Sequence, residues 1–287
     1  MAGAGSAEPE QSLTTLGVVR DQGPHLSVSQ LNSYHDCSLK YQLKYVDRVP
    51  KEASGAMIAG IAVHRAIEAC ELEGWWPDAE LFQGPAAPGP ATFLQVFHTL
   101  IRDARGPIRW GGNPSGSENA DWWDFNGVIQ MQRYQHARVA MAGNGWGVAE
   151  DRTEYRVEVQ FDGVSRPVVG YLDKFLVHEG GEPIIVDWKT GKVGYADPMQ
   201  FATYARALEI VRGIHVTRGM AIFLRAAKAA SAVRHMVFTD LIPRVDGIYA
   251  AMERSMDAGV YTPNTKAWCD TCEVRESCWY FKGSREA

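Results

Sequence analysis

Several features that would mark whole classes of protein are absent from this sequence. No apolar stretch in its 287 residues approaches the ~20 residues that a membrane span requires. The opening MAGAGSAEPE lacks the charged and apolar regions of a secretory signal. No G-x-x-x-x-G-K-[ST] loop occurs, so the chain carries no helicase motor motif. Its five cysteines argue against a disulfide framework, and we expect a soluble, cytoplasmic protein without a membrane partner.

Acidic residues are missing from one long stretch of the chain. The net charge of −5 does not fit a protein that coats DNA, so any nucleic-acid binding requires a local basic surface. Between Glu209 and Asp240 there is no Asp or Glu, whereas five basic residues occur: Arg212, Arg218, Arg225, Lys228 and Arg234. This asymmetry favours a phosphate-facing surface over an ordinary solvated face.

The segment 168–192 predicts an antiparallel hairpin with charges inside two apolar strands. If the turn is centred near Gly180, Asp173 falls opposite Asp187, and Lys189 projects from the same face. Two facing carboxylates repel each other unless a cation lies between them, and oxygen ligands suit Mg²⁺ or Mn²⁺. The alternative is a surface hairpin with scattered charges.

The rest of the chain divides into helical and strand-like parts. Tryptophans concentrate between the first helices and the strands, where we expect most of them to pack in a core. The expected segments are a mobile tail (1–24), N-terminal helices (25–74), a helical insertion (75–149), a strand-rich core (150–240) and a C-terminal helix with a cysteine-rich end (241–287).

Cysteine spacing predicts a metal centre. Cys269, Cys272 and Cys278 supply three thiolates, and Cys37, near the other end of the chain, is the best candidate for a fourth. Thiolates select soft centres, either an iron–sulfur cluster or Zn²⁺. The fifth cysteine, Cys70, lies in a helical pattern and is expected to be a small buried apolar residue.

Motifs spread along the chain resemble those of the PD-(D/E)XK nuclease superfamily, in the RecB-like branch that carries an iron–sulfur cluster. They occur in family order and span most of the chain outside the insertion. Small departures are Ser38 where many relatives have Pro, and the lack of Pro before Asp173. The matching motifs are Ser27 to Tyr45 with Cys37, Gly60-x-x-x-His64-x-x-Ile67-Glu68, Gly170-x-x-Asp173, Asp187-x-Lys189-Thr190-Gly191, Gln200-x-x-x-Tyr204, and the terminal cysteines.

The resemblance implies a restriction-endonuclease-like α/β fold, a mixed β-sheet flanked by helices, with a [4Fe–4S] cluster joining the two ends of the chain. We favour this cluster over Zn²⁺. The implied metal ligands are His64, Asp173 and Asp187, and the implied catalytic residues are Asp173, Asp187 and Lys189. Substrate contacts are assigned to Gln200, Tyr204 and Lys192, with Glu68 in a supporting role and Glu158 as a weaker candidate. The cluster ligands are Cys37, Cys269, Cys272 and Cys278.

The function implied by the resemblance is metal-dependent hydrolysis of DNA. A divalent ion polarises the phosphate and lowers the pKa of bound water. We expect an exonuclease acting on single-stranded DNA or DNA ends, with protein partners from CRISPR adaptation or phage-type recombination and repair. The alternative from another class is a non-catalytic iron–sulfur module that binds DNA or docks a partner.

Overall fold

The computed structural model describes residues 25–112, 116–147, 152–192, 194, 196–228, 232–264 and 269–283. The predicted mobile tail, residues 1–24, lies outside the described residues. No helix among the described residues is both long enough and apolar enough to cross a membrane.

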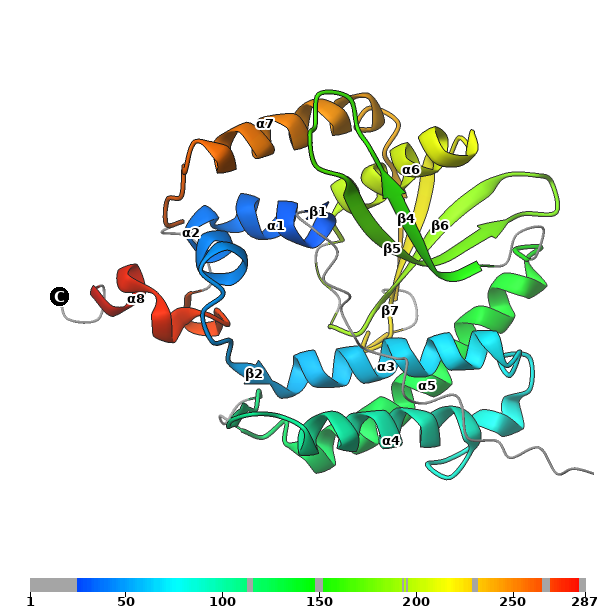
Figure 1. Ribbon diagram of the computed structural model, residues 1–287. Coiled ribbons are helices and arrows are strands. Elements are labelled where there is room, and N and C mark those ends of the chain that lie inside the picture. The colour runs from blue at the N-terminus through cyan, green and yellow to red at the C-terminus, as the bar shows by residue number, and fades with distance from the viewer. Residues whose placement is uncertain are drawn as a thin grey trace, which may run out of the picture.

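A six-stranded mixed sheet forms the centre of the molecule (Figure 1). Strand β5 pairs with β4 along one edge and with both β1 and β6 along the other, and β7 and β8 extend the sheet beyond β6. The β1–β5 and β6–β7 pairs are parallel and the other pairs are antiparallel. The strands are β1 (Leu26–Ser27), β4 (Arg152–Val159), β5 (Val168–Val177), β6 (Pro183–Lys189), β7 (Arg218–Phe223) and β8 (Val233–Val237).

The predicted hairpin register is confirmed. Lys174 pairs with Val186 and Val177 with Pro183, which is the register of a turn centred on Gly180. Within the turn, His178 N–H donates to Glu182 O at 2.8 Å. Because Asp173 and Asp187 are equally far from Gly180, this register carries their carboxylates to the same end of the hairpin.

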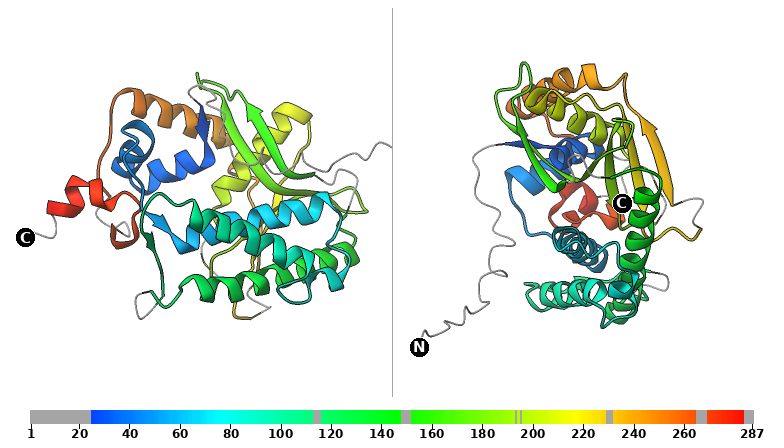
Figure 2. Two further views of the ribbon diagram at one scale, coloured as in Figure 1. Left: turned by 60° about the horizontal axis from the view of Figure 1, so that its bottom comes forward. Right: turned by 90° about the vertical axis from the view of Figure 1, so that its right-hand side faces the viewer.

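Helices cover both faces of the sheet (Figures 1 and 2). Two short strands, β2 (Ala53–Ser54) and β3 (Ile108–Arg109), pair separately. The longer helices begin at side-chain caps where the sequence offers them, such as Ser54 before α3 and Asp197 before α6. The helices are α1 (Val28–Asp36), α2 (Ser38–Tyr41), α3 (Gly55–Leu72), α4 (Pro88–Arg102), α5 (Ala120–Gly143), α6 (Pro198–Arg212), α7 (Val245–Asp257) and α8 (Trp279–Gly283).

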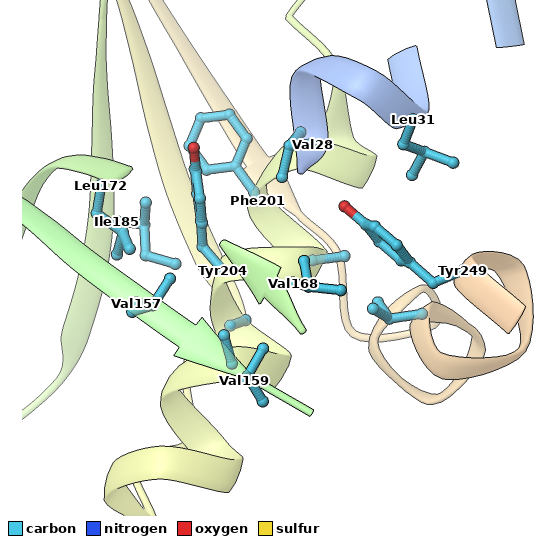
Figure 3. Packing of buried hydrophobic residues seen from close by; sticks show 14 of the residues in the cluster. Val28, Leu31, Val157, Val159, Val168, Leu172, Ile185, Phe201, Tyr204 and Tyr249 are labelled. Carbon is cyan, nitrogen blue, oxygen red and sulfur yellow. The ribbon is translucent and has the colours of Figure 1, made fainter. Parts of the chain in front are cut away.

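The two faces bury separate cores. One core joins β4 and β5 to α1, α6 and α7, and Figure 3 shows Tyr204 and Phe201 of α6 packed among the strand residues. The other core lies between the sheet and α3, α4 and α5, and contains Trp188 of β6. Tryptophans of the predicted insertion pack here, Trp123 fully and Trp75, Trp76, Trp110, Trp122 and Trp146 in part, as expected.

The two ends of the chain meet, as Figures 1 and 2 show for α2 and the segment before α8. Leu39 N–H donates to Thr262 O, and Thr262 N–H donates to Ser38 Oγ at 2.7 Å. The motif stretch from Ser27 to Tyr45 is not one continuous helix. It breaks at Cys37, whose extended backbone (φ −166°) makes that residue the N-cap of α2, and it continues as a π-helix over Gln42–Val46.

The basic stretch does not form the single phosphate-facing surface that its sequence suggested. Arg218 begins β7 whereas Arg225 follows its end, so the two lie at opposite ends of this strand. Arg218 faces Glu182 at 3.7 Å and Arg225 faces Glu118 at 3.0 Å. The charges of these arginines are neutralised by carboxylates from segments that are distant in the sequence. The sequence pattern could not show this pairing.

Candidate active site and a cysteine-lined cavity

The candidate active site forms where β5 and β6 separate. Along the edge of β5 that faces β6, β1 pairs with Val168 and Val169, and the β6 ladder resumes at Lys174. Between these ladders the Asp173 side chain replaces a strand partner, because its Oδ2 accepts the Trp188 N–H at 2.8 Å. The aspartate is therefore both a structural acceptor and a charge at the opening of the sheet.

Asp187 and Lys189 form a closed ring with Gln200 of α6. Lys189 Nζ lies 2.8 Å from Asp187 Oδ2 and donates to Gln200 Oε1 at 3.1 Å. Gln200 Nε2 donates to Asp187 Oδ1 at 3.0 Å. Alternation along β6 sends these two charged side chains to one face and Trp188 to the other, where its ring meets Tyr134 edge-on. The ring of contacts fixes the lysine directly beside the carboxylate.

The carboxylate of Asp187 lies in an electrostatically unfavourable environment. Burial raises its pKa, repulsion from Asp173 raises it further, and Lys189 and His64 oppose the shift. Its Oδ2 is buried, and despite the nearby Lys189 it accepts no hydrogen bond of good geometry within the described part of the chain. A carboxylate in this state gains from a cation.

His64 reaches the site from α3. Its Nδ1 lies 3.5 Å from Asp173 Oδ1. The helix can approach because Gly60 faces the end of β6, where an added Cβ would lie 3.1 Å from Thr190 Oγ1. Thus the Gly60 and His64 motif and the Asp187, Lys189 and Thr190 motif are in contact.

The side chains fit a divalent ion without forming a complete set of metal ligands. Among the described residues, no three His, Cys, Asp or Glu side chains are grouped as a ready metal site. At the active site the oxygens already have partners, since Lys189 faces Asp187 and Trp188 N–H binds Asp173. The poorly satisfied Asp187 Oδ2, a second carboxylate and an imidazole nevertheless match the donors that Mg²⁺ or Mn²⁺ accepts.

Tyr204 of α6 packs beside the site, against β5. It is buried against Gly170, where an added Cβ would lie 2.6 Å from Tyr204 Cε1. Burial raises the pKa of Tyr204, as does the nearby Asp173, so the phenol stays protonated. This contact between the glycine of one motif and the tyrosine of another could not be predicted from either motif alone.

The substrate-contact candidate Lys192 and the weaker candidate Glu158 lie outside this ring. Lys192 is 76% exposed and lies 3.6 Å from Glu118 of the insertion. Glu158 is opposite Val169, four residues along β5 from Asp173, and pairs with Arg156. At about 3.3 Å per residue, that displacement is about 13 Å, so the structure does not bring Glu158 to the aspartates.

Glu68 lies one turn after His64 on α3. Burial raises its pKa and Arg65 opposes the shift. Glu68 therefore lies half-buried on the same helix as His64, and the charge that acts on it comes from Arg65 of that helix.

Four cysteines from the two ends of the chain line one cavity of about 430 Å³ without forming a ready metal site among the described residues: Cys37, Cys269, Cys272 and Cys278. Cys37 Sγ accepts the backbone N–H groups of Lys40 and Asn264, each at 3.4 Å. Burial, and then the proximity of the other three thiols, raises the pKa of Cys269. Cys70 is instead fully buried in the core under α3, as predicted.

Comparisons with known proteins show the family to which the chain belongs. A family model of the PD-(D/E)XK nuclease superfamily matches residues 25–279. The chain is 25% identical over 286 residues to the Gene 69 protein of Mycobacterium phage D29, covering 90% of this chain and 98% of that protein. A crystal structure of SSO0001 aligns with 85% of this chain and 94% of its own at 12% identity, but its TM-score of 0.38 is too low to support an argument.

Proposed function

Because the chain belongs to the PD-(D/E)XK nuclease superfamily, whose members are typically metal-dependent nucleases, we propose that it is a deoxyribonuclease with exonuclease activity on single-stranded DNA or DNA ends. One observation carries the proposal. Asp173 and Asp187 come from adjoining strands, and Lys189 and His64 join them within hydrogen-bonding or ion-pairing distance. Such a group has no packing function that apolar residues would not perform better.

In this proposal His64, Asp173 and Asp187 hold one or two Mg²⁺ or Mn²⁺ ions. When bound, such an ion polarises the phosphate and makes hydroxide available at neutral pH. The buried Asp187 oxygen without a well-oriented donor is the position where a cation would relieve most repulsion. Lys189, which lies beside Asp187, would orient the attacking water and stabilise the charge that develops on the phosphate.

Gln200 and Tyr204 position the reacting groups. Gln200 bonds both Asp187 and Lys189, so it can retain the lysine when the carboxylate turns to a cation. Tyr204 fixes the β5 backbone at Gly170, close to Asp173. The Lys192 side chain is largely exposed, so its ammonium can move to contact a phosphate of the bound strand.

The cysteine-lined cavity is proposed to hold a [4Fe–4S] cluster, with Zn²⁺ as the alternative. Four thiols around one cavity match the ligand number of either centre, and two backbone N–H groups donate to Cys37 Sγ, as they could to a cluster thiolate ligand. Its role is structural, because its ligands fasten segments from opposite ends of the chain.

The test of the cysteine site is metal content. Cys37→Ala is expected to lose iron and to melt at a lower temperature, whereas Cys70→Ala keeps its iron because Cys70 lies in another core. Anaerobic purification, an absorption spectrum and metal analysis distinguish iron from zinc. Full metal content in Cys37→Ala would remove this residue from the ligand set.

The test of the activity is digestion of end-labelled single- and double-stranded DNA with Mn²⁺ or Mg²⁺. Asp187→Ala and Lys189→Ala should each lose activity by about 10²-fold or more, while Arg102→Ala, at an exposed helix end, serves as a purification control. Equal cutting by all variants would mean a contaminant. If the wild-type protein and the variants bind DNA but none of them cuts it, the non-catalytic module is favoured.

The biological setting is proposed as phage-type recombination and repair or CRISPR adaptation. The relative from a mycobacteriophage supports keeping the phage setting in view, although the name of that protein describes no activity. Co-purification with a recombination protein or with a CRISPR integrase would separate the two settings.

A further inference from the structure

One face of the β4–β5 hairpin lies open beside the active site. Val157, Gly170 and Leu172 point to the core under α6, and their neighbours in the strands point to solvent. Tyr171 is 52% exposed, although aromatic rings of this size are usually covered. Packing within the chain does not explain this residue.

Tyr171 lies beside Arg156. The two residues are directly opposite each other in the β4–β5 register, and Glu158, followed by Tyr171, raises the pKa of the Arg156 guanidinium. Arg156 also pairs with Glu158, which lies two residues along the same strand. The guanidinium therefore lies next to Tyr171, whose side chain stays about half exposed.

The position of the ring relative to the catalytic group is set by the strand. Tyr171 is two residues before Asp173, so both side chains leave the same side of β5 about 7 Å apart. On α3, exposed Met57 and Ile61 continue the helix face that carries His64. Exposed apolar side chains therefore lie near the candidate metal ligands on both β5 and α3. The cationic side chain of Arg156 is next to Tyr171 on β4.

We propose that Tyr171 stacks on an unpaired base of the DNA strand whose phosphate lies at Asp173 and Asp187. This rests on the proposed nuclease function and names the residue by which the site would select single-stranded DNA or frayed ends over an intact duplex. In an intact duplex the faces of the bases are already stacked on each other, so the ring can be used only by a base that has left the stack. Arg156 contributes a contact to the neighbouring phosphate.

The experiment measures DNA binding without cleavage, by fluorescence anisotropy with Ca²⁺ in place of the catalytic ion. The probes are a labelled oligothymidine and a labelled blunt hairpin duplex, and the full-length protein is compared with Tyr171→Ala and Tyr171→Phe. Phe125→Ala is the control, because Phe125 is 69% exposed on α5, against α4 and outside the site.

Tyr171→Ala is expected to weaken oligothymidine binding roughly 5- to 150-fold, which corresponds to the loss of one base-stacking contact. Binding of the duplex should change less than about 2-fold, and Tyr171→Phe, which keeps the ring, should remain within about 3-fold of wild type. Phe125→Ala should bind both probes normally. Unchanged oligothymidine binding by Tyr171→Ala, or an equal loss on both probes, would overturn the inference.

The two proposals fail differently. If the wild-type protein cuts DNA, Asp187→Ala does not and Tyr171→Ala behaves as wild type in both assays, the nuclease stands and the stacking role is wrong. If no cutting occurs but Tyr171→Ala still loses oligothymidine binding selectively, the chain binds single strands without the proposed catalysis.

Discussion

Asp173 and Lys174 are neighbours on β5, yet they belong to two groups of charges with opposite properties. Lys174 Nζ lies 2.5 Å from Glu71 Oε2, while Glu71 Oε1 accepts from Arg138 Nε at 3.1 Å and from the Tyr134 hydroxyl at 2.8 Å. The charged side chains of this second group are at most 2% exposed. The group of Asp173 is partly open and contains a carboxylate whose pKa is raised.

The difference lies in how each carboxylate is satisfied. Both oxygens of Glu71 face cations or donors, so the group fastens α3 and α5 to β5. In contrast, Asp187 is buried beside a second carboxylate, and one of its oxygens lacks a well-oriented donor. A sealed group stabilises one arrangement, whereas an incompletely satisfied group retains affinity for something that arrives later.

The largest expected effect comes from breaking the sealed group. Glu71→Gln keeps the shape but removes the carboxylate that neutralises Arg138 and Lys174 in the core. We expect a loss of ~3–5 kcal/mol in the free energy of unfolding. Urea denaturation measures it, with Asp103→Asn as the control because its pair with Arg102 is exposed. A stability equal to wild type would mean that water enters the group.

This contrast also shows what the sequence could predict. The hairpin register followed from strand periodicity and the turn, and it placed the two aspartates correctly at one end. The four cysteines were predicted to meet because three local thiols need a fourth, and they line one cavity. Both predictions depend on local geometry or on a simple count.

The sealed group could not be predicted in this way. Glu71 and Arg138 lie on helices whose relative rotation is set by packing of the core, and neither has a sequence motif. Likewise, the carboxylates that offset Arg218 and Arg225 come from distant segments, so the absence of local acidic residues was misleading. Pairing across long sequence separations depends on tertiary structure and leaves no local periodicity.

The carboxylate of Glu253 on α7 is another well-satisfied carboxylate, and its contribution to stability should depend on pH. Burial would raise its pKa, but hydrogen bonds from Arg166 and from the backbone and hydroxyl of Ser165 lower it to about 2. Since the folded pKa is depressed, the stabilisation is present above the unfolded value of 4.5 and is lost as the pH falls toward about 2.

The expected pH-dependent contribution of Glu253 is on the order of 3 kcal/mol at neutral pH, and more than half of it should disappear by about pH 3. Urea denaturation of wild type and Glu253→Gln at several pH values measures the difference between the two curves. A difference that stayed constant from pH 6 to pH 3 would show that Glu253 has an ordinary pKa.

The contact between Gly170 and Tyr204 can be broken without altering charge. Gly170→Ala places a Cβ 2.6 Å from Tyr204 Cε1, so the ring or the strand must shift. We expect a cost of ~1–3 kcal/mol in stability, with lower activity because the displacement reaches Asp173. Gly191→Ala is the matched control, since an added Cβ there meets no atom within 4 Å. Thermal melts that are the same for both variants would contradict the close packing.

The smallest expected change in stability has the opposite sign. Asp187→Asn removes a buried negative charge that faces Asp173 but keeps the size of the side chain and its contact with Gln200. Without divalent ions the variant should gain about 1 kcal/mol in the free energy of unfolding, because repulsion is relieved at a site selected for activity. Added Mn²⁺ should then stabilise wild type more than the variant, through binding to the folded state. If Asp187→Asn were instead destabilised as strongly as Glu71→Gln, Asp187 would belong with the sealed charges, and its place in a cation site would be lost.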